Sequence, residues 1–113
     1  MSPEEFEAAV SAAIEGLPEW VHDKIDNLVI VVAEAPDPEH GDLLGLYEGI
    51  SLLDRSSDYY GALPDQITIY RKPHLALGLD RLETEREVRR TVLHEVAHHL
   101  GNDDDRLHEL GWD

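Results

Sequence analysis

One uninterrupted stretch, residues 82–100, limits the possible folds more than any other part of the sequence, because it contains neither Gly nor Pro. At 100° per residue its apolar side chains fall on one arc of about 180°, as in a helix that packs one face on a core. The residues on this arc are Val88, Val92, Leu93, Val96, Ala97 and Leu100. Gly101 follows where a left-handed backbone commonly ends a helix. We therefore predict a long amphipathic helix that ends at Gly101.

Three shorter helices are expected at the two ends of the chain. Ser2 can cap a first helix, Pro3 suits its first position, and Glu5 can reach back to the cap. Apolar residues then recur at helical spacing up to Gly16, where this helix should end. A second helical piece is expected over residues 18–24. The last helix should cover residues 103–110, because three successive Asp near its start suit the positive end of a helix dipole.

The middle of the chain contains the candidate strands. Residues 28–32 form a continuous apolar run of the kind found in strands covered on both faces, so we expect this strand at the centre of the sheet. Residues 43–48 and 50–54 are two further extended candidates, reached through a loop over residues 35–42. Residues 66–71 alternate between apolar and polar, as in a half-buried strand with one face toward solvent or a ligand.

Length and charge limit the size of the protein and its partners. A chain of 113 residues fits one domain, residues 1–113, with a single modest core. It carries 25 acidic and 9 basic side chains, a formal charge of −16. Such a chain repels phosphate backbones and anionic lipid, so we expect neither nucleic acid nor a membrane as a partner. The sequence does not predict the oligomeric state.

The absence of Cys removes several kinds of chemistry. It excludes disulfides, thiolate-bound metals and a Cys nucleophile, and it leaves the seven His as the nitrogen ligands. The first ten residues have no basic stretch, and no apolar run approaches the roughly 18 residues that a membrane span requires. We therefore expect a cytoplasmic protein.

The long helix contains the sequence His94-Glu95-Val96-Ala97-His98. Four residues complete nearly one helical turn, so the imidazoles of His94 and His98 should stand on the same face, close enough to share one cation. Glu95 lies about 100° around the helix, where it can hydrogen-bond a water on the metal without becoming a ligand. This spacing predicts a zinc site with Glu95 as general base.

A catalytic zinc site needs a third protein ligand. Gly101 allows the backbone to reverse after the helix, and this reversal can bring Asp104 back toward the two imidazoles. Asp103 and Asp105 are the alternatives, because the register of the turn is inferred from the sequence. The full pattern reads His-Glu-x-x-His-x-x-Gly-x-x-Asp.

Residues 94–112, HEVAHHLGNDDDRLHELGW, resemble the minimal zincin-like bacterial metallopeptidase family, and residues 44–50 and 63–71 extend the resemblance upstream. It implies a small α+β zincin-like fold with a short mixed sheet, a long helix that carries the motif, and a short C-terminal helix. It also implies one zinc ion and the hydrolysis of a peptide or protein substrate. Carried over residue by residue, it assigns His94, His98 and Asp104 as metal ligands and Glu95 as the catalytic base.

Other histidines and tyrosines have less specific interpretations. His99 lies about 100° around the helix from His98 and so faces away from the proposed metal site; we expect it to be a hydrogen-bonded core residue. His108 is either an exposed helix residue, a fourth ligand, or a group that stabilises an oxyanion. His22, His40 and His74 are expected on the surface. The four tyrosines, Tyr47, Tyr59, Tyr60 and Tyr70, are expected mostly to pack, although one could donate a hydrogen bond in the cleft.

Two other functions compete with peptide hydrolysis. A domain this small has little surface for a deep cleft, so it could be a zinc-bound interaction module without catalysis. A bacterial rRNA-maturation endonuclease family also uses paired His on a helix followed by Gly, but it lacks the Glu present here as Glu95. For a peptidase, we expect the strand over residues 66–71 to pair with an extended peptide, and we expect basic or neutral substrates rather than acidic ones.

Overall fold

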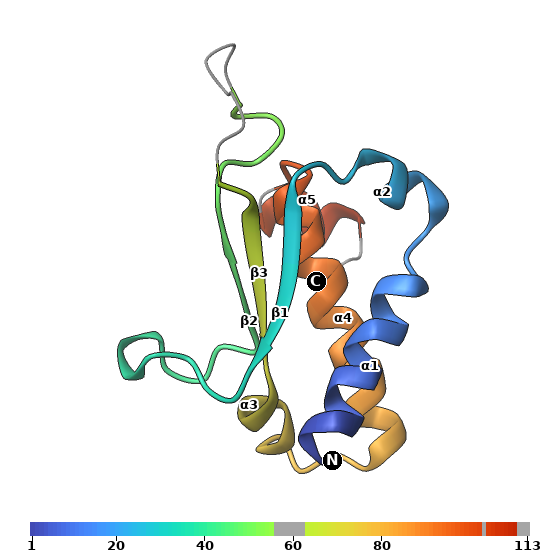
Figure 1. Cartoon of the computed structure of the whole chain (residues 1–113), viewed down its shortest axis with the longest axis vertical. Coiled ribbons are helices and arrows are strands. Elements are labelled where there is room, and N and C mark those ends of the chain that lie inside the picture. Colours follow the sequence, from blue (N-terminus) through green and yellow to red (C-terminus); the bar gives the residue numbers. More distant parts are fainter. Residues whose placement is uncertain (56–62, 103, 111–113) are drawn as a thin grey trace.

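The computed structural model covers the whole chain, and the structure describes residues 1–55, 63–102 and 104–110; of Asp104, Leu107 and Leu110 it describes the backbone only. The described elements, shown in Figure 1, are α1 (Pro3–Glu15), α2 (Glu19–Lys24), β1 (Leu28–Ala33), the 3₁₀ turn η1 (Pro38–His40), β2 (Gly45–Glu48), β3 (Asp65–Tyr70), α3 (Arg71–Leu75), α4 (Arg81–His99) and α5 (Asp104–Leu110). This arrangement is the α+β fold predicted from the sequence, with the long helix and the short last helix in their expected places.

The three strands form a mixed sheet in the order β1-β3-β2. β1 runs parallel to β3, and β2 runs antiparallel to it. The prediction that residues 28–32 form the central strand is therefore wrong, because β3 occupies that place. Val29 and Val31 of β1 are 41% and 40% exposed, since they lie on the sheet face that the helices leave uncovered. An unbroken apolar run did not reveal that only one of its faces is covered.

The strand β3 is buried along most of its length, contrary to the prediction of a half-buried strand. Ile67 and Ile69 face the helices, and Thr68 and Tyr70 on the other face are also buried. Because β3 hydrogen-bonds to a strand on each side, neither of its edges is available to a bound peptide. The expected pairing of a substrate with residues 66–71 is therefore wrong as well.

The segment after β2 forms turns instead of the extended structure predicted for residues 50–54. Gly49 has φ +151°, and a Cβ at this position would lie 2.2 Å from the Asp65 carboxylate. The Asp54 N–H then donates to the Ser51 carbonyl at 2.9 Å, which closes a turn. We call residues 49–55 the 49–55 loop; it lies near the end of α4.

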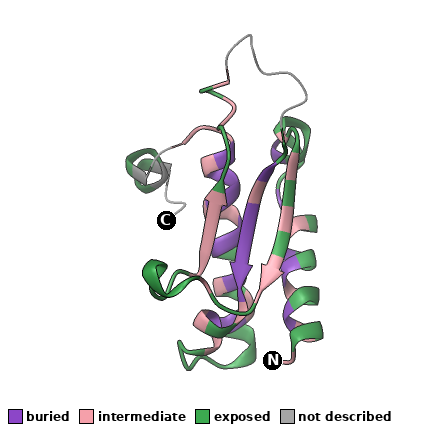
Figure 2. Cartoon of the chain, turned by 60° about the vertical axis from the view of Figure 1, so that its left-hand side comes forward, coloured by how far each residue is buried: buried purple, intermediate pink, exposed green. Residues whose placement is uncertain are grey.

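The helices α1 and α4 cover one side of the sheet (Figures 1 and 2). α1 begins as predicted, with Ser2 accepting from the Glu5 N–H and Glu5 accepting from the Ser2 N–H. α4 buries its apolar face between α1 and the sheet, which leaves the opposite face for the motif histidines. The core residues from these elements are Phe6, Val10, Ala13, Leu17, Val21, Ile67, Ile69, Val88, Val92 and Val96. In the part of the chain that the structure describes, every helix is too short or too polar to cross a bilayer.

Candidate metal centre

The two motif histidines lie side by side near the end of α4. The Nε2 atoms of His94 and His98 are 3.2 Å apart, and their rings meet edge to face with centroids 4.8 Å apart. Two nitrogens bound to one tetrahedral zinc at about 2.0–2.1 Å are separated by roughly 3.3 Å. The two imidazoles therefore have the separation that a shared zinc ion requires, although a hydrogen bond between the two nitrogens has a similar length.

Glu95 lies beside this pair and is only 9% exposed. Its side chain packs against β2 at Gly45, where the strand has no side chain. A Cβ on Gly45 would lie 3.1 Å from the Cγ of Glu95 and 2.8 Å from the Cγ2 of Thr91. Gly45 therefore allows the strand to approach the helix closely at the position of the motif glutamate.

A cavity of about 320 Å³ opens between residues 42–45 and α4. His94 and Glu95 line it at one side, and Glu87, Arg90 and Thr91 line it along the preceding turns of the helix. Leu43 and Leu44 contribute apolar surface from the strand side. The motif residues therefore border a space large enough for a substrate side chain.

The chain reverses after α4 in a Schellman arrangement. The Gly101 N–H donates to the His98 carbonyl at 2.9 Å, and the Asn102 N–H donates to the Ala97 carbonyl at 3.0 Å. Gly101 has φ +102°, and a Cβ there would lie 2.5 Å from the Cγ of Leu53. The sharp turn that the sequence predicted at Gly101 is confirmed, and the 49–55 loop packs directly on it.

The predicted third ligand, Asp104, follows the turn at Gly101. α5 begins at Asp104, but the side chain of Asp104 and the whole of Asp103 lie outside the described residues. Asp105 is described and exposed. Among the described residues no group of three His, Cys, Asp or Glu side chains could hold a metal ion. The assignment of Asp104 therefore stays a prediction.

Tyr47 of β2 stands against the histidines at the end of α4. Its ring is parallel to that of His98, at an interplanar angle of 13° and a centroid distance of 6.5 Å. It meets the next ring, that of His99, edge-on at 6.1 Å. The hydroxyl of Tyr47 donates to Oδ2 of Asp65 at 2.5 Å. Burial and the bond to this carboxylate raise the pKa of Tyr47 above its ordinary value, which keeps the hydroxyl a donor.

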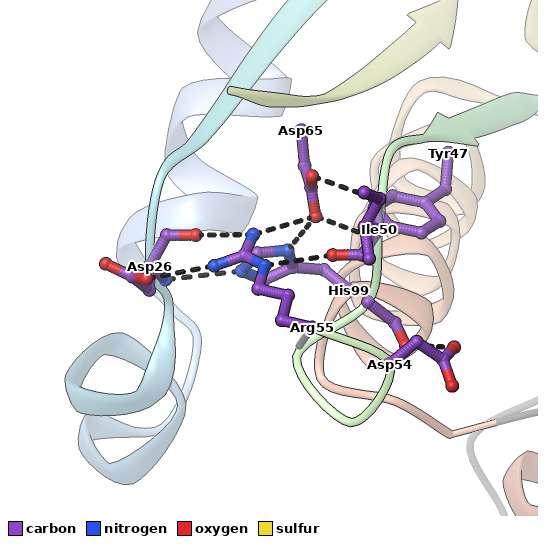
Figure 3. A network of polar contacts seen from close by, with 8 residues as sticks. Asp26, Tyr47, Ile50, Asp54, Arg55, Asp65 and His99 are labelled. Carbon is purple, nitrogen blue, oxygen red and sulfur yellow. Dashed lines mark hydrogen bonds and ion pairs between the residues drawn. The ribbon is translucent and has the colours of Figure 1, made fainter. Parts of the chain in front are cut away.

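Asp65 is the centre of a buried polar network, shown in Figure 3. Besides Tyr47, its carboxylate accepts from Nδ1 of His99 at 2.8 Å, from Arg55 at 3.1 Å and from the Ile50 N–H at 3.1 Å. Burial by itself would raise the pKa of Asp65, but these donors outweigh it and hold the pKa below its ordinary value. The carboxylate is therefore ionised and fixed in position.

The same network fastens the 49–55 loop to the rest of the chain. Arg55 donates to the Ile50 carbonyl at 3.0 Å and to the Asp26 carboxylate at 2.9 Å. The Leu52 N–H donates to the His99 carbonyl at 3.0 Å, at the last turn of α4. Neither Asp65 nor Arg55 is a site residue that the sequence predicted. Asp65 lies in a segment that resembles the family, but no local spacing links it to the histidines.

The remaining histidines divide into buried and exposed residues. His99 is fully buried, and its Nε2 accepts from the Asp26 N–H at 3.2 Å, so its Nδ1 carries the proton donated to Asp65. The prediction of a hydrogen-bonded core histidine is confirmed. His22 and His40 are exposed, as expected. His108, on α5, is also exposed, which favours its interpretation as an exposed helix residue over a fourth ligand or an oxyanion-stabilising group.

The prediction that His74 is a surface residue is wrong. It is fully buried in α3, with Nδ1 at 2.6 Å from the Tyr70 carbonyl and Nε2 at 2.9 Å from the Thr91 hydroxyl. Burial lowers the pKa of His74, so the ring is neutral and carries its proton on Nδ1. A single His next to Pro gave no local signal of burial, because the covering residues come from distant segments, including Phe6 with its ring 5.3 Å away.

Comparison with known proteins gives a family and a structural relative. A family model described as zincin-like metallopeptidase matches residues 25–112. A conserved hypothetical protein from Thermus thermophilus is similar in structure over 97% of this chain and 98% of its own, with a TM-score of 0.58 and 25% sequence identity. No curated protein matches the chain.

Proposed function

This chain belongs to the zincin-like metallopeptidase family, and we propose on that basis that it hydrolyses peptide bonds with one zinc ion held by His94, His98 and Asp104. The observation that carries the proposal is the 3.2 Å separation of the two Nε2 atoms, with Glu95 on the adjacent side of the same helix. Two imidazoles and a carboxylate form a ligand set typical of catalytic zinc, with one position left for solvent or substrate.

Zinc bound at such a site acts as a Lewis acid toward a carbonyl oxygen and makes water more acidic. Glu95 would act as the base that takes the proton from the attacking water, and would then deliver it to the amine that leaves. Its position against Gly45 limits where its carboxylate can lie. No side-chain nucleophile is needed, which fits a chain without Cys.

We propose that the substrate binds along β2 rather than β3. β2 is an edge strand beside α4, and its pairing with β3 fixes which backbone groups are available. The Tyr70 N–H donates to the Leu44 carbonyl, so Leu44 directs its backbone groups toward β3. Leu46, two residues after Leu44, pairs with Thr68 and has the same orientation. Antiparallel pairs alternate, so Gly45 and Tyr47 direct their N–H and C=O groups to the open edge. An extended peptide can bond to these groups as an added strand.

The cavity beside the motif suggests the type of side chain that the substrate presents. Leu43 and Leu44 give it an apolar wall, and the charged residues Glu87 and Arg90 at its helix side lie 3.6 Å apart. We propose that an apolar side chain next to the cleaved bond enters this cavity. The formal charge of −16 further disfavours acidic peptides.

The central test uses Glu95→Gln, which keeps the shape of the side chain and removes the base. We expect the purified unmodified protein and this variant each to contain one zinc per chain, and only the unmodified protein to cleave peptides from an unbiased library. Loss of a general base should lower the rate at least about 100-fold. The matched control is Glu85→Gln, a partly exposed position of the same helix with a surface ion pair to Arg81.

Other outcomes of this experiment would favour the other functions. Zinc in both proteins with cleavage in neither would support a zinc-bound interaction module. Cleavage of RNA but not of peptides would support the nuclease. Absence of zinc from metal-replete unmodified protein would contradict the metal centre itself.

A further inference from the structure

We propose that Tyr47 is a positioning residue of the metal centre: its ring fixes the orientation of the His98 imidazole, and Asp65 fixes the ring. The inference rests on the proposed function, because it takes His98 to be a metal ligand. It adds a residue on another element, β2, to a site that the motif confines to α4 and the turn after it.

The first step is the contact between the rings. An imidazole turns about its last side-chain torsion in a broad, roughly two-fold potential, so a helix alone does not fix the direction of Nε2. The Tyr47 ring lies nearly parallel to that of His98 at a centroid distance of 6.5 Å, within the range of favourable aromatic pairs. A parallel ring on one side restricts this rotation and so limits the directions that Nε2 can take.

The second step is the placement of Tyr47 on the sheet. Tyr47 pairs with Ile67, a fully buried residue of the β3 face that packs on the helices. Directly opposed residues of neighbouring strands share a face, so Tyr47 also points toward α4. The backbone thus directs the ring toward the two consecutive histidines, His98 and His99, both of which it contacts.

The third step is the anchor of the hydroxyl. The Tyr47 hydroxyl donates to a carboxylate that is 2% exposed, and a bond to a buried charged acceptor is stronger than one between neutral groups. Three other donors, from His99, Arg55 and the Ile50 backbone, hold the same carboxylate. Asp65 therefore cannot follow the tyrosine if the ring moves, and it acts as a fixed point.

Asp65 also connects the Tyr47 ring to the end of α4. His99 follows His98 directly, and its imidazole donates to the same Asp65 oxygen that accepts from Tyr47. A single carboxylate thus fixes the tyrosine ring on one side and the end of α4 on the other. The relative position of Tyr47 and His98 is set by this common partner.

The experiment compares Tyr47→Leu, which removes the ring, with Tyr47→Phe, which keeps the ring and removes its anchor. The matched control is Tyr70→Leu. Tyr70 is a tyrosine of the same sheet that is more fully buried than Tyr47, but it lies on the opposite face, because it follows Ile69, which faces the helices. All four proteins are examined with zinc and without it, and their unfolding free energies are measured in parallel.

With zinc, the readout is the dissociation constant from competition with a chromophoric chelator. Loss of a group that orients a ligand typically weakens metal binding about 10- to 100-fold, and we expect this for Tyr47→Leu. Tyr47→Phe should bind zinc more tightly than Tyr47→Leu and more weakly than the unmodified protein. Tyr70→Leu should leave the zinc dissociation constant unchanged, even if it lowers the unfolding free energy as much as Tyr47→Leu does. Equal zinc affinity in Tyr47→Leu and the unmodified protein would overturn the inference.

Without zinc, the readout is the NMR spectrum of the His98 imidazole. We expect the ring resonances of His98 to move and broaden in Tyr47→Leu, to change less in Tyr47→Phe, and to stay in place in Tyr70→Leu. Unchanged His98 resonances in Tyr47→Leu would refute a positioning role. This measurement separates the two proposals, because it decides the role of Tyr47 even if the unmodified protein binds no zinc.

Discussion

At the scale of single residues, two consecutive histidines have opposite environments. His98 lies at the edge of the candidate metal centre, with its Nε2 facing that of His94, whereas His99 is fully buried between Asp26 and Asp65. A rotation of 100° along the helix accounts for the difference. Helical periodicity predicts that His94 and His98 share a face and that His99 is a core residue, and the structure shows both.

The close contact at Gly45 leads to a prediction about the motif glutamate. In Gly45→Ala the added methyl would press on the side chains of Thr91 and Glu95, so β2 or the glutamate must shift. We expect kcat to fall about 10- to 100-fold, because small displacements of a catalytic group have effects of this size. Zinc content should stay at one per chain. Peptide cleavage and metal analysis check this, with Gly16→Ala at the end of α1 as the control; unchanged kcat would contradict it.

The buried His74 predicts a dependence of stability on pH. Its pKa in the folded protein lies below the unfolded value of about 6.5, so the unfolded chain binds the extra proton first as the pH falls. The stability that the neutral ring contributes is fully present above about pH 6.5 and is lost as the pH falls toward the folded pKa.

Denaturant unfolding from neutral to mildly acidic pH measures this effect. We expect the unfolding free energy to decline over that range, and to decline less in His74→Gln, which has no titrating ring at this position. His22→Gln changes an exposed histidine and should keep the unmodified slope. Identical slopes for His74→Gln and the unmodified protein would refute the assignment.

At the scale of elements, the helices were easier to predict from sequence than the sheet. The start of α1, the bounds of α4 and the turn at Gly101 depend on residues within a few positions of one another, so local patterns were sufficient. The order of strands depends on pairing between β1 and β3, whose residues Leu28 and Asp65 are far apart in the chain. No local pattern shows which strand receives a neighbour on both edges.

The open edge of β2 predicts an alternating effect of substrate methylation. A methyl group on a substrate amide that bonds to β2 removes one hydrogen bond and should raise KM about 2- to 10-fold. Methylation of the next amide along the peptide should have little effect, since alternate amides of a strand point to opposite sides. A series of peptides, each methylated at one position, tests this by steady-state kinetics. Equal effects at successive positions would argue against strand addition.

At the scale of the whole molecule, the candidate metal centre and its support are assembled from distant parts of the chain. The motif lies on α4, the flanking strand is β2, and the Asp65 network joins β3, the 49–55 loop and Asp26. The sequence predicted the histidine pair but not this support, because Asp26 and His99 are 73 positions apart. The side chain of Asp104 lies outside the described residues, so its predicted role is still a hypothesis.

The family match begins at residue 25, yet α1 contributes much of the core that holds α4. Phe6 is fully buried there, and its removal in Phe6→Ala should lower the unfolding free energy by about 3–5 kcal/mol. A domain near the lower end of ordinary stability, about 5 kcal/mol, would become marginal. Thermal unfolding measures the loss, with Glu7→Ala on the exposed face of α1 as control. A change below about 1 kcal/mol would contradict the expected contribution of Phe6 to the core.

The different burial of the adjacent residues His98 and His99 has an evolutionary consequence. His94 and His98 are only partly buried and lie beside the apolar core rather than within it, so a duplicated gene copy could lose either of them and still yield a folded product. The same copy could not readily lose His99, whose imidazole satisfies a buried carboxylate and a backbone amide. Among descendants of such a duplication, the second histidine of the adjacent pair would therefore outlast the first, and its survival alone would be no sign of retained enzymatic activity.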